Sequence, residues 1–311
     1  MKRFLYKLLL FSMPVLLAWG LLELFYRHTP NNYTVKNESL KTRANKIEIL
    51  LFGDSHCLYG LNPKYFSAPA FNLSNVSQTI YFDKLLFDKQ VDHLPKLKQV
   101  VFCIEYTNLS QKDNTGEDDW RKFHYQRYMD LKVPSIEPYD PRNFSVTLTQ
   151  TPSKTRDLLK RYFKTATITD CDSNGWGTNY RKADRIIPAS IAQRRAKMQE
   201  DGSIDFRQNS QRLQQIIDQC NKKNIQVLIV SMPQTTVYEK YLNPNKLTAI
   251  INTCKQFEVN NPDNVCYLNL FHDQRFYDDD FFDADHLNDA GAVKASKIVS
   301  KYLISMQRSK F

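Results

Sequence analysis

Short apolar runs alternate along most of the chain with segments whose apolar residues recur at helical spacing. Such runs are typical of strands buried on both faces of a parallel sheet. They occupy residues 47–52, 70–73, 100–104, 225–230 and 265–268. Strands that alternate with helices predict an α/β fold, because each parallel connection must cross one face of the sheet. We therefore expect a three-layer α/β/α domain with a mainly parallel central sheet, of the flavodoxin-like kind.

The helical spacing is clearest at residues 81–91, at 213–220 and after Asn288, whose side chain can cap the last helix. The stretch from about 109 to 205 breaks the alternation of strands and helices. We interpret this stretch as a long insertion that shapes the substrate site rather than as a separate domain.

The N-terminus carries a basic start and then an apolar run from residue 8 to 22. This run is near the short end of the roughly 17–25 residues that cross a bilayer. A cleaved signal peptide needs a small-residue cleavage site, for which residues 18–20 are a poor candidate. We therefore favour an uncleaved signal-anchor over residues 1–26, with a cytoplasmic N-terminus and an extracytoplasmic domain. A cleaved signal and a buried helix of a soluble protein are the alternatives. A polar linker at 27–45 is expected to lead to the domain at 46–311.

Positive charge is concentrated between residues 154 and 197, where eleven Lys and Arg accompany four Asp, within a chain of net charge +10. Such a run can be a solvated helical face, or it can face anionic lipid headgroups, an acidic glycan or nucleic acid. No nucleic-acid motif accompanies the charge, so we expect no nucleic-acid partner. The six cysteines have neither CxxC nor metal-ligand spacing, and we predict no disulfide framework, no metal and no cofactor.

The first candidate site is Gly53-Asp54-Ser55, which follows the first predicted strand directly. Ligands of open parallel sheets bind outside the carboxyl ends of the strands, so Ser55 can point its hydroxyl into that crevice. If a helix starts just after it, nearby backbone N–H groups can meet an oxyanion. A tight turn explains the Gly-Asp-Ser sequence equally well.

The second candidate site is Asp283-Ala-Asp-His286, on a loop before the last helix. An Asp three residues before a His can fold its carboxylate onto the imidazole Nδ1–H, which leaves Nε2 free to accept a serine proton. An acidic surface loop with an incidental His is the alternative. A metal site is a third possibility, although His286 has no partner His nearby.

Together these two motifs resemble the SGNH/GDSL hydrolase superfamily. The resemblance implies Ser55 as nucleophile, His286 as base and Asp283 as the acid that orients it. The wider string Asp-x-Asp-His-Leu-Asn-x-x-Gly-Ala at 283–292 is similar to membrane-anchored members tied to surface-polysaccharide O-acylation. The resemblance spans about 47–305, and only these short motifs carry it.

The middle motifs of the family supply oxyanion donors, and this chain departs from them. Ser77 stands where a glycine usually provides a backbone N–H, and Asn108 is the nearest candidate for the usual side-chain Asn. Serine keeps the backbone N–H but tolerates a left-handed conformation less well than glycine. The resemblance therefore implies Ser77 and Asn108 as oxyanion or substrate residues, while Asn108 can equally be a loop residue.

These features predict a serine esterase or O-acyltransferase that acts on cell-surface or exported polysaccharide, with a membrane-bound acyltransferase as a possible partner. Trp120 and Trp176 could stack on sugar rings or pack in a core. A non-catalytic glycan-binding or scaffolding protein is the alternative, and a Ser55–His286 separation above roughly 5 Å would favour it. A third hypothesis, a basic surface binder using 154–197, predicts affinity that falls steeply with salt.

Overall fold

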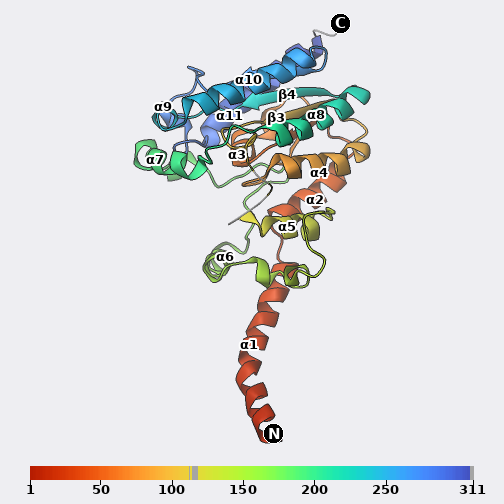
Figure 1. Cartoon of the computed structure of the whole chain (residues 1–311), viewed down its shortest axis with the longest axis vertical. Helices are drawn as coiled ribbons and strands as arrows, with labels where there is room; N and C mark the ends of the chain where they lie inside the picture. The colour runs from red at the N-terminus through yellow and green to blue at the C-terminus, as the bar shows by residue number, and fades with distance from the viewer. Residues whose placement is uncertain (112, 114–117, 309–311) are drawn as a thin grey trace. The chain divides into compact units, whose positions relative to one another are not determined.

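A five-stranded parallel sheet forms the centre of the computed structural model, which describes residues 1–111, 113 and 118–308 (Figure 1). The strand order is β2-β1-β3-β4-β5, and every neighbouring pair is parallel. The strands are β1 (Ile49–Phe52), β2 (Ala70–Asn72), β3 (Gln99–Cys103), β4 (Gln226–Ser231) and β5 (Val265–Asn269). Each overlaps one of the predicted runs, so the predicted α/β class and the parallel sheet are confirmed. The order is that of flavodoxin-like folds.

Helices cover both faces of the sheet. Outside residues 1–43 and 114–169, the α-helices are α3 (Ser55–Gly60), α4 (Ile80–Gln90), α7 (Pro188–Gln199), α8 (Arg207–Lys222), α9 (Thr236–Glu239), α10 (Pro244–Asn260) and α11 (Asp289–Arg308). On one face, Leu51 and Val101 share a buried cluster with Val299 of α11. On the other, the ring of Phe52 meets that of Phe87 in α4 at 6.2 Å. The alternation of side chains along each strand thus places one core on each face.

The capping prediction for the last helix is confirmed. The Asn288 side chain accepts hydrogen bonds from the backbone N–H groups of Ala290 and Gly291, both at 3.0 Å.

Short 3-10 helices lie at η1 (Pro63–Tyr65), η2 (Val91–His93), η4 (Pro141–Asn143), η5 (Thr147–Thr149), η6 (Lys182–Asp184) and η7 (Asp278–Asp280). All six cysteines are free thiols.

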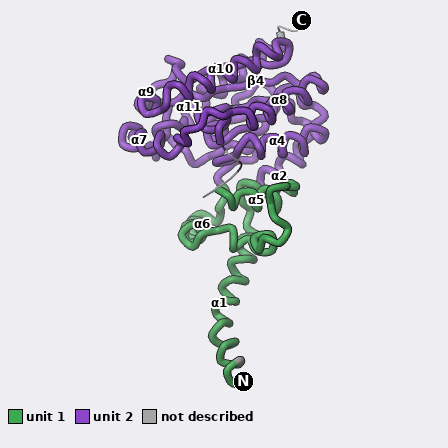
Figure 2. Tube along the Cα trace, in the orientation of Figure 1, with its two compact units in different colours: residues 1–34, 114–169 green, residues 35–113, 170–311 purple. Residues whose placement is uncertain are grey.

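The chain divides into two compact units (Figure 2). Unit 1 comprises residues 1–34 and 114–169, and unit 2 comprises 35–113 and 170–311. The predicted insertion at 109–205 is therefore shared between the units; its residues 112 and 114–117 lie outside the described residues. The basic run 154–197 is divided in the same way: residues 154–169 belong to unit 1 and residues 170–197 belong to unit 2.

Unit 1 contains α1 (Lys2–His28), α5 (Arg121–Tyr128) and α6 (Pro152–Thr165). Its small core includes Tyr33, whose ring meets those of Tyr125 at 5.0 Å and His124 at 5.4 Å. The segment predicted as a linker contains α2 (Asn32–Arg43), in which Leu40 is buried. This segment is thus partly helical and packed.

Helix α1 is long and apolar enough to cross a membrane. Its most apolar 18-residue window has a mean hydropathy of 2.0, and none of that window is buried. The exposure distinguishes α1 from the core helix of a soluble protein. A membrane anchor and a signal sequence both have these properties.

Candidate active site

Ser55 is placed by a sharp turn at the end of β1. Gly53 has φ +137°, and a Cβ there would lie 3.1 Å from Cys103, so this position requires glycine. Asp54 then caps α3 by accepting the backbone N–H of His56 at 2.9 Å. Ser55 is therefore the first residue of α3, at the carboxyl edge of the sheet. Ligands bind at this edge in open parallel folds, next to the reversal of strand order between β1 and β3.

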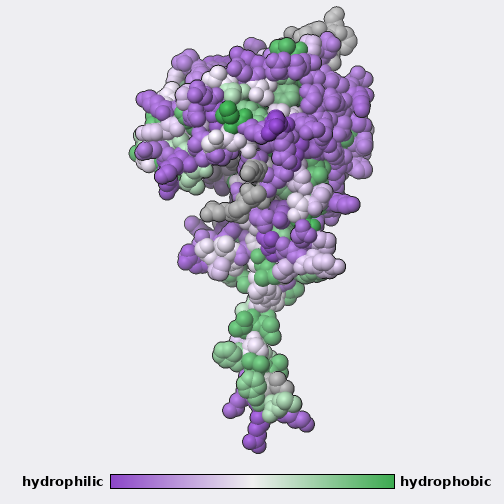
Figure 3. Space-filling model, in the orientation of Figure 1, coloured by the Kyte–Doolittle hydropathy of each residue, from purple (hydrophilic) through white to green (hydrophobic). Residues whose placement is uncertain are grey.

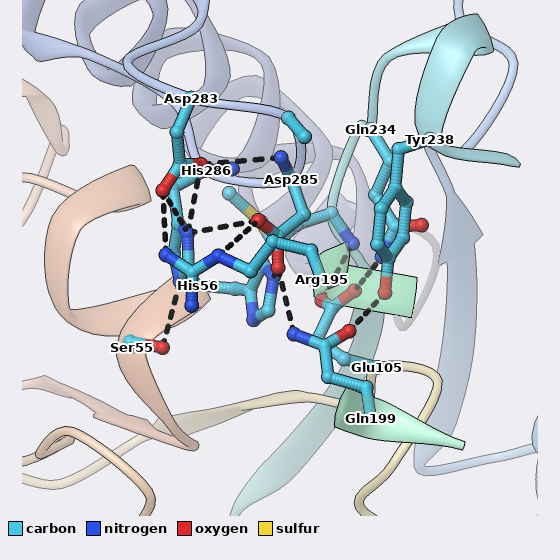
Figure 4. Close-up of polar contacts among 12 residues, drawn as sticks. Ser55, His56, Glu105, Arg195, Gln199, Gln234, Tyr238, Asp283, Asp285 and His286 are labelled. Carbon is cyan, nitrogen blue, oxygen red and sulfur yellow. Dashed lines mark hydrogen bonds and ion pairs between the residues drawn. The ribbon is translucent and has the colours of Figure 1, made fainter. Parts of the chain in front are cut away.

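The three residues predicted at the two ends of the domain lie together (Figure 4). The Ser55 Oγ is 2.8 Å from the His286 Nε2. The His286 Nδ1 is 3.0 Å and 3.2 Å from the two carboxylate oxygens of Asp283. His286 is 3% exposed and Asp283 is 1% exposed, while Ser55 is half-buried. A hydroxyl, an imidazole and a carboxylate thus form one continuous hydrogen-bonded chain.

The Asp-x-x-His spacing has a local structural cause. The Asp283 carboxylate also accepts the backbone N–H groups of Asp285 at 3.2 Å and His286 at 2.9 Å. The loop therefore wraps around the carboxylate before α11 begins. This wrapping fixes the side chain of Asp283 against the imidazole of the same loop.

A second imidazole, which the sequence analysis did not single out, lies beside the first. The His56 Nδ1 is 3.0 Å from Asp54 and its Nε2 is 3.5 Å from Asp285. The rings of His56 and His286 stack with centroids 4.3 Å apart. Asp285 also lies 3.3 Å from the His286 Nδ1. The two motifs themselves were the available signal, because the first holds two ionisable residues, Asp54 and His56, that the predicted site does not need, and the second holds one, Asp285.

Helix α7 supplies the groups that offset the buried carboxylates (Figure 4). An Arg195 Nη is 2.7 Å from Asp283, and the Arg195 Nε is 3.5 Å from Asp285. Gln199 donates to Asp285 at 2.8 Å and contacts the Tyr238 hydroxyl. Arg195 belongs to the basic run that was interpreted as a solvated face or surface patch. That interpretation is wrong for Arg195, because its guanidinium pairs with two buried carboxylates.

The charges of the site are set by these contacts. Burial would lower the pKa of His56, but the carboxylates of Asp54 and Asp285 raise it well above its ordinary value. Burial and the His56 charge also oppose protonation of His286, while Asp285 and Asp283 raise its pKa above the ordinary value. Burial would raise the pKa of Asp283, and the neighbouring His286 and Arg195 lower it. At neutral pH the His56 ring is therefore a cation held against His286.

Another buried carboxylate, Glu105, follows β3 by two residues. Burial raises its pKa to about 7. It accepts the backbone N–H of Met232 at 2.9 Å and the side-chain amide of Gln234 at 3.3 Å. Glu105 therefore links the segments that follow β3 and β4 at the carboxyl edge of the sheet.

The two predicted oxyanion residues have different environments. Ser77 follows β2 in the left-handed region, with φ +54°, a conformation that glycine adopts more readily than serine. Asn108 is buried; its amide donates to Asp54 at 3.1 Å, and its oxygen accepts the backbone N–H of Glu105 at 2.5 Å. In these contacts Asn108 holds the carboxylate of Asp54 in place. A role toward an oxyanion stays a prediction for both Ser77 and Asn108.

Aromatic rings line the site next to His286. Tyr59 stacks on Tyr180 at 3.7 Å, and Tyr180 stacks on Phe282 at 4.1 Å. The Trp176 indole donates to the Tyr59 carbonyl at 2.9 Å, so its polar atom is used within the protein. Trp120 belongs to unit 1, where the Lys154 ammonium lies 3.2 Å from its ring centre. The rings of Tyr180 and Tyr59 both lie edge-on to His286, at 5.3 Å and 6.3 Å.

Among the described residues, His56, Asp285 and His286 form the group whose potential metal-ligand atoms lie within 4.8 Å of one another. These atoms already take part in the contacts with Ser55, Asp54 and Gln199. The Arg195 guanidinium, 3.5 Å from Asp285, also disfavours a second cation there. The donor set fits a hydrogen-bonded network better than a metal centre.

Comparisons with known proteins find no matching family model and no matching curated protein. Among solved structures, the chain is similar to one described as "a putative platelet activating factor from Streptococcus pneumonia". The two share 12% sequence identity and a TM-score of 0.42, over 94% of this chain and 98% of that one. At this level of similarity, the α/β assignment depends on the strand order described above.

Proposed function

We propose that the protein is a serine acyl-ester enzyme, with Ser55 as nucleophile, His286 as general base and Asp283 as the residue that orients His286. One observation carries the proposal: the Ser55 Oγ lies 2.8 Å from the His286 Nε2, while Asp283 lies 3.0 Å from the opposite ring nitrogen. A nucleophile within hydrogen-bonding reach of a base that is itself oriented by a third group is the arrangement that activates a serine hydroxyl. This distance is well below the separation expected for a non-catalytic domain.

The proposed reaction has two halves. As the Ser55 Oγ bonds to the acyl carbon, its proton passes to the His286 Nε2, and the protonated ring then gives that proton to the leaving alcohol. Water or an acceptor hydroxyl next loses a proton to the His286 Nε2 and attacks the acyl carbon of the acyl-Ser55 ester. As the bond between that carbon and the Ser55 Oγ breaks, His286 returns the proton to the Oγ and free Ser55 is restored. The backbone N–H of Ser77 and the amide of Asn108 are the proposed donors to the oxyanion; loss of one such donor typically costs about 100- to 1000-fold in rate.

We also propose a substrate class and a cellular location for this ester chemistry. We infer that the acceptor or ester is a cell-surface or exported polysaccharide, which makes the protein an O-acyltransferase or an esterase. Support comes from the resemblance of residues 283–292 to membrane-anchored polysaccharide-acylating proteins and from the apolar exposed helix α1. In this proposal α1 is a single-pass anchor with a cytoplasmic N-terminus, and a membrane-bound acyltransferase supplies the acyl group.

The test compares the full chain in detergent with Ser55→Ala. The natural sequence is expected to react with a fluorophosphonate probe and to hydrolyse p-nitrophenyl acetate, and Ser55→Ala should lose labelling and at least about 10³-fold of its activity. Ser67→Ala is the matched control, because Ser67 is exposed and near in sequence. Labelling that persists in Ser55→Ala would remove Ser55 from the mechanism. A folded natural protein that neither labels nor hydrolyses esters would favour the glycan-binding or scaffolding alternative.

A further inference from the structure

Unit 1 contains an apolar groove of about 690 Å³ that the proposed ester chemistry does not use. Its walls come from the end of α1, from the segment around η5 and from α6. The apolar lining includes Trp19, Leu22, Leu148, Leu159 and Phe163. Phe163 is 83% exposed, so a large apolar ring stands in solvent beside the groove. An apolar groove with such a rim indicates a binding surface.

The groove is continuous with the exposed apolar surface of α1. Figure 3 shows apolar side chains along this helix and hydrophilic ones at its N-terminal end. From Phe4 to Leu22 the helix rises about 28 Å, which matches the roughly 30 Å hydrocarbon core of a bilayer. If α1 crosses a membrane, Trp19 and Leu22 therefore lie near its outer boundary, where Trp side chains commonly sit.

The end of α1 is firmly joined to the rest of unit 1. The Glu23 carboxylate accepts the backbone N–H of Thr147 at 3.1 Å and the Ser145 hydroxyl at 2.8 Å. The Tyr26 hydroxyl donates to Thr155 of α6 at 2.8 Å. Because these contacts fix α6 and η5 against α1, insertion of the helix would bring both elements to the same boundary.

Helix α6 carries the charge that such a boundary attracts. It holds five basic residues and one acidic residue, and its exposed face includes Arg156, Lys160 and Lys164. Arg156 and Lys160 line the groove next to its apolar walls. Arg156 also lies 3.4 Å from Asp157, in an exposed pair that contributes little. Basic residues above an apolar face are typical of helices that lie in the headgroup region.

We propose that this groove binds an anionic phospholipid of the membrane that α1 enters, with an acyl chain against Trp19 and Leu22 and the phosphate beside Arg156 and Lys160. The inference depends on the proposed anchor. Lipid contact at the groove would fix the orientation of unit 1 on the membrane, since α1 alone leaves a protein free to rotate about the helix axis.

The test places a benzophenone amino acid at position 163 of the full chain in nanodiscs of phosphatidylcholine and phosphatidylglycerol. Illumination is expected to give a phospholipid adduct, detected by intact mass. The matched control is the same amino acid at position 259, because Val259 is 67% exposed on α10 of unit 2. Arg156→Gln with Lys160→Gln should lower the phosphatidylglycerol share of the adduct roughly tenfold or more. Arg207→Gln with Lys255→Gln, two exposed charges of unit 2, should not.

Each outcome bears on the proposal. A chain that resists carbonate extraction but gives no adduct at position 163 would overturn the groove assignment and leave the anchor intact. An adduct between two copies of the chain would replace the lipid with self-association. A chain that fails to insert would overturn both the anchor and the lipid site. A phosphatidylglycerol share unchanged by loss of both charges would overturn the headgroup assignment.

Discussion

The imidazole rings of His56 and His286 lie face to face, with centroids 4.3 Å apart and planes 12° from parallel. Two adjacent rings do not both take a proton without a large electrostatic cost. His56 has a carboxylate at each ring nitrogen, whereas His286 has Ser55 at one of them. His56 is therefore the ring that keeps the proton, and its charge opposes protonation of the ring that contacts the serine.

Replacement of His56 by Asn should move the pH dependence of the proposed ester hydrolysis. The variant removes the His56 charge, which lowers the pKa of His286, while the carboxylates of Asp285 and Asp283, which raise it, remain. The pKa of His286 should rise, and the acidic limb of kcat/KM should shift to higher pH by about one unit, the ordinary spread of histidine pKa values. Activity at high pH should persist. His93→Asn, at an exposed histidine, is the control, and an unshifted limb would contradict the assignment.

The two carboxylates next to His286 should contribute unequally. Asp283 lies 3.0 Å from the Nδ1 and Asp285 lies 3.3 Å from it, but Asp285 also binds Gln199 and lies near His56. Asp283→Asn would present an amide to Nδ1 and favour the tautomer whose Nε2 cannot accept the serine proton, with an expected loss of about 10⁴-fold in kcat. Asp285→Asn should lower kcat much less than Asp283→Asn does. It should lower the thermal stability more.

Steady-state ester hydrolysis and thermal unfolding separate these two effects. Asp278→Asn changes an exposed carboxylate just before the same loop and serves as the control. Equal losses of kcat in the Asp283 and Asp285 variants would mean that the carboxylates act as one unit rather than as an orienting residue and a supporting one.

Local features of the sequence were sufficient to predict that Ser55, Asp283 and His286 lie close together, while their catalytic roles stay a prediction. A serine after the first strand of a parallel sheet must lie at its carboxyl edge, and an Asp three residues before a His can close onto it within one loop. Arg195 could not be predicted, because only the packing of α7 against that loop turns one charge of a basic run into the partner of two carboxylates. The division of residues 109–205 between two units could not be predicted for the same reason. It depends on the packing of residues 114–169 with residues 1–34 in unit 1.

Ser77 provides a test of backbone strain at a proposed oxyanion donor. Its φ of +54° costs a residue with a Cβ roughly 1–2 kcal/mol, while glycine loses about 0.5–1 kcal/mol through its greater freedom when unfolded. Ser77→Gly should therefore raise the free energy of unfolding by up to about 1 kcal/mol, and Ser77→Ala should leave it nearly unchanged. Both variants keep the backbone N–H, so both should keep ester hydrolysis. Loss of activity in both would assign the contribution to the hydroxyl instead; urea unfolding measures the stability.

Asp83 should make stability depend on pH in the opposite sense to Asp283. It is 2% exposed in the first turn of α4 and accepts the Gln78 amide at 2.6 Å. Burial, with a contribution from the charge of Asp54, raises its pKa to about 7. The folded pKa thus exceeds the unfolded value of about 3.9, so this contribution is complete below pH 4 and is lost as pH rises through about 7. For Asp283, whose folded pKa is lowered, stability is instead lost as pH falls.

Asp83→Asn removes this titration while it keeps an oxygen that can accept from Gln78. The variant should therefore gain in Tm relative to the natural protein as pH rises from 5 to 8, because only the natural protein must bury a charge or hold a proton at the higher pH. Asp88→Asn, at an exposed position of the same helix, should show no such trend. The difference in Tm between Asp83→Asn and the natural protein, measured at several pH values in one buffer system, isolates this residue from Glu105, whose buried carboxyl has the same sign. A difference that stays constant across this range would mean that Asp83 is already charged in the folded protein at pH 5.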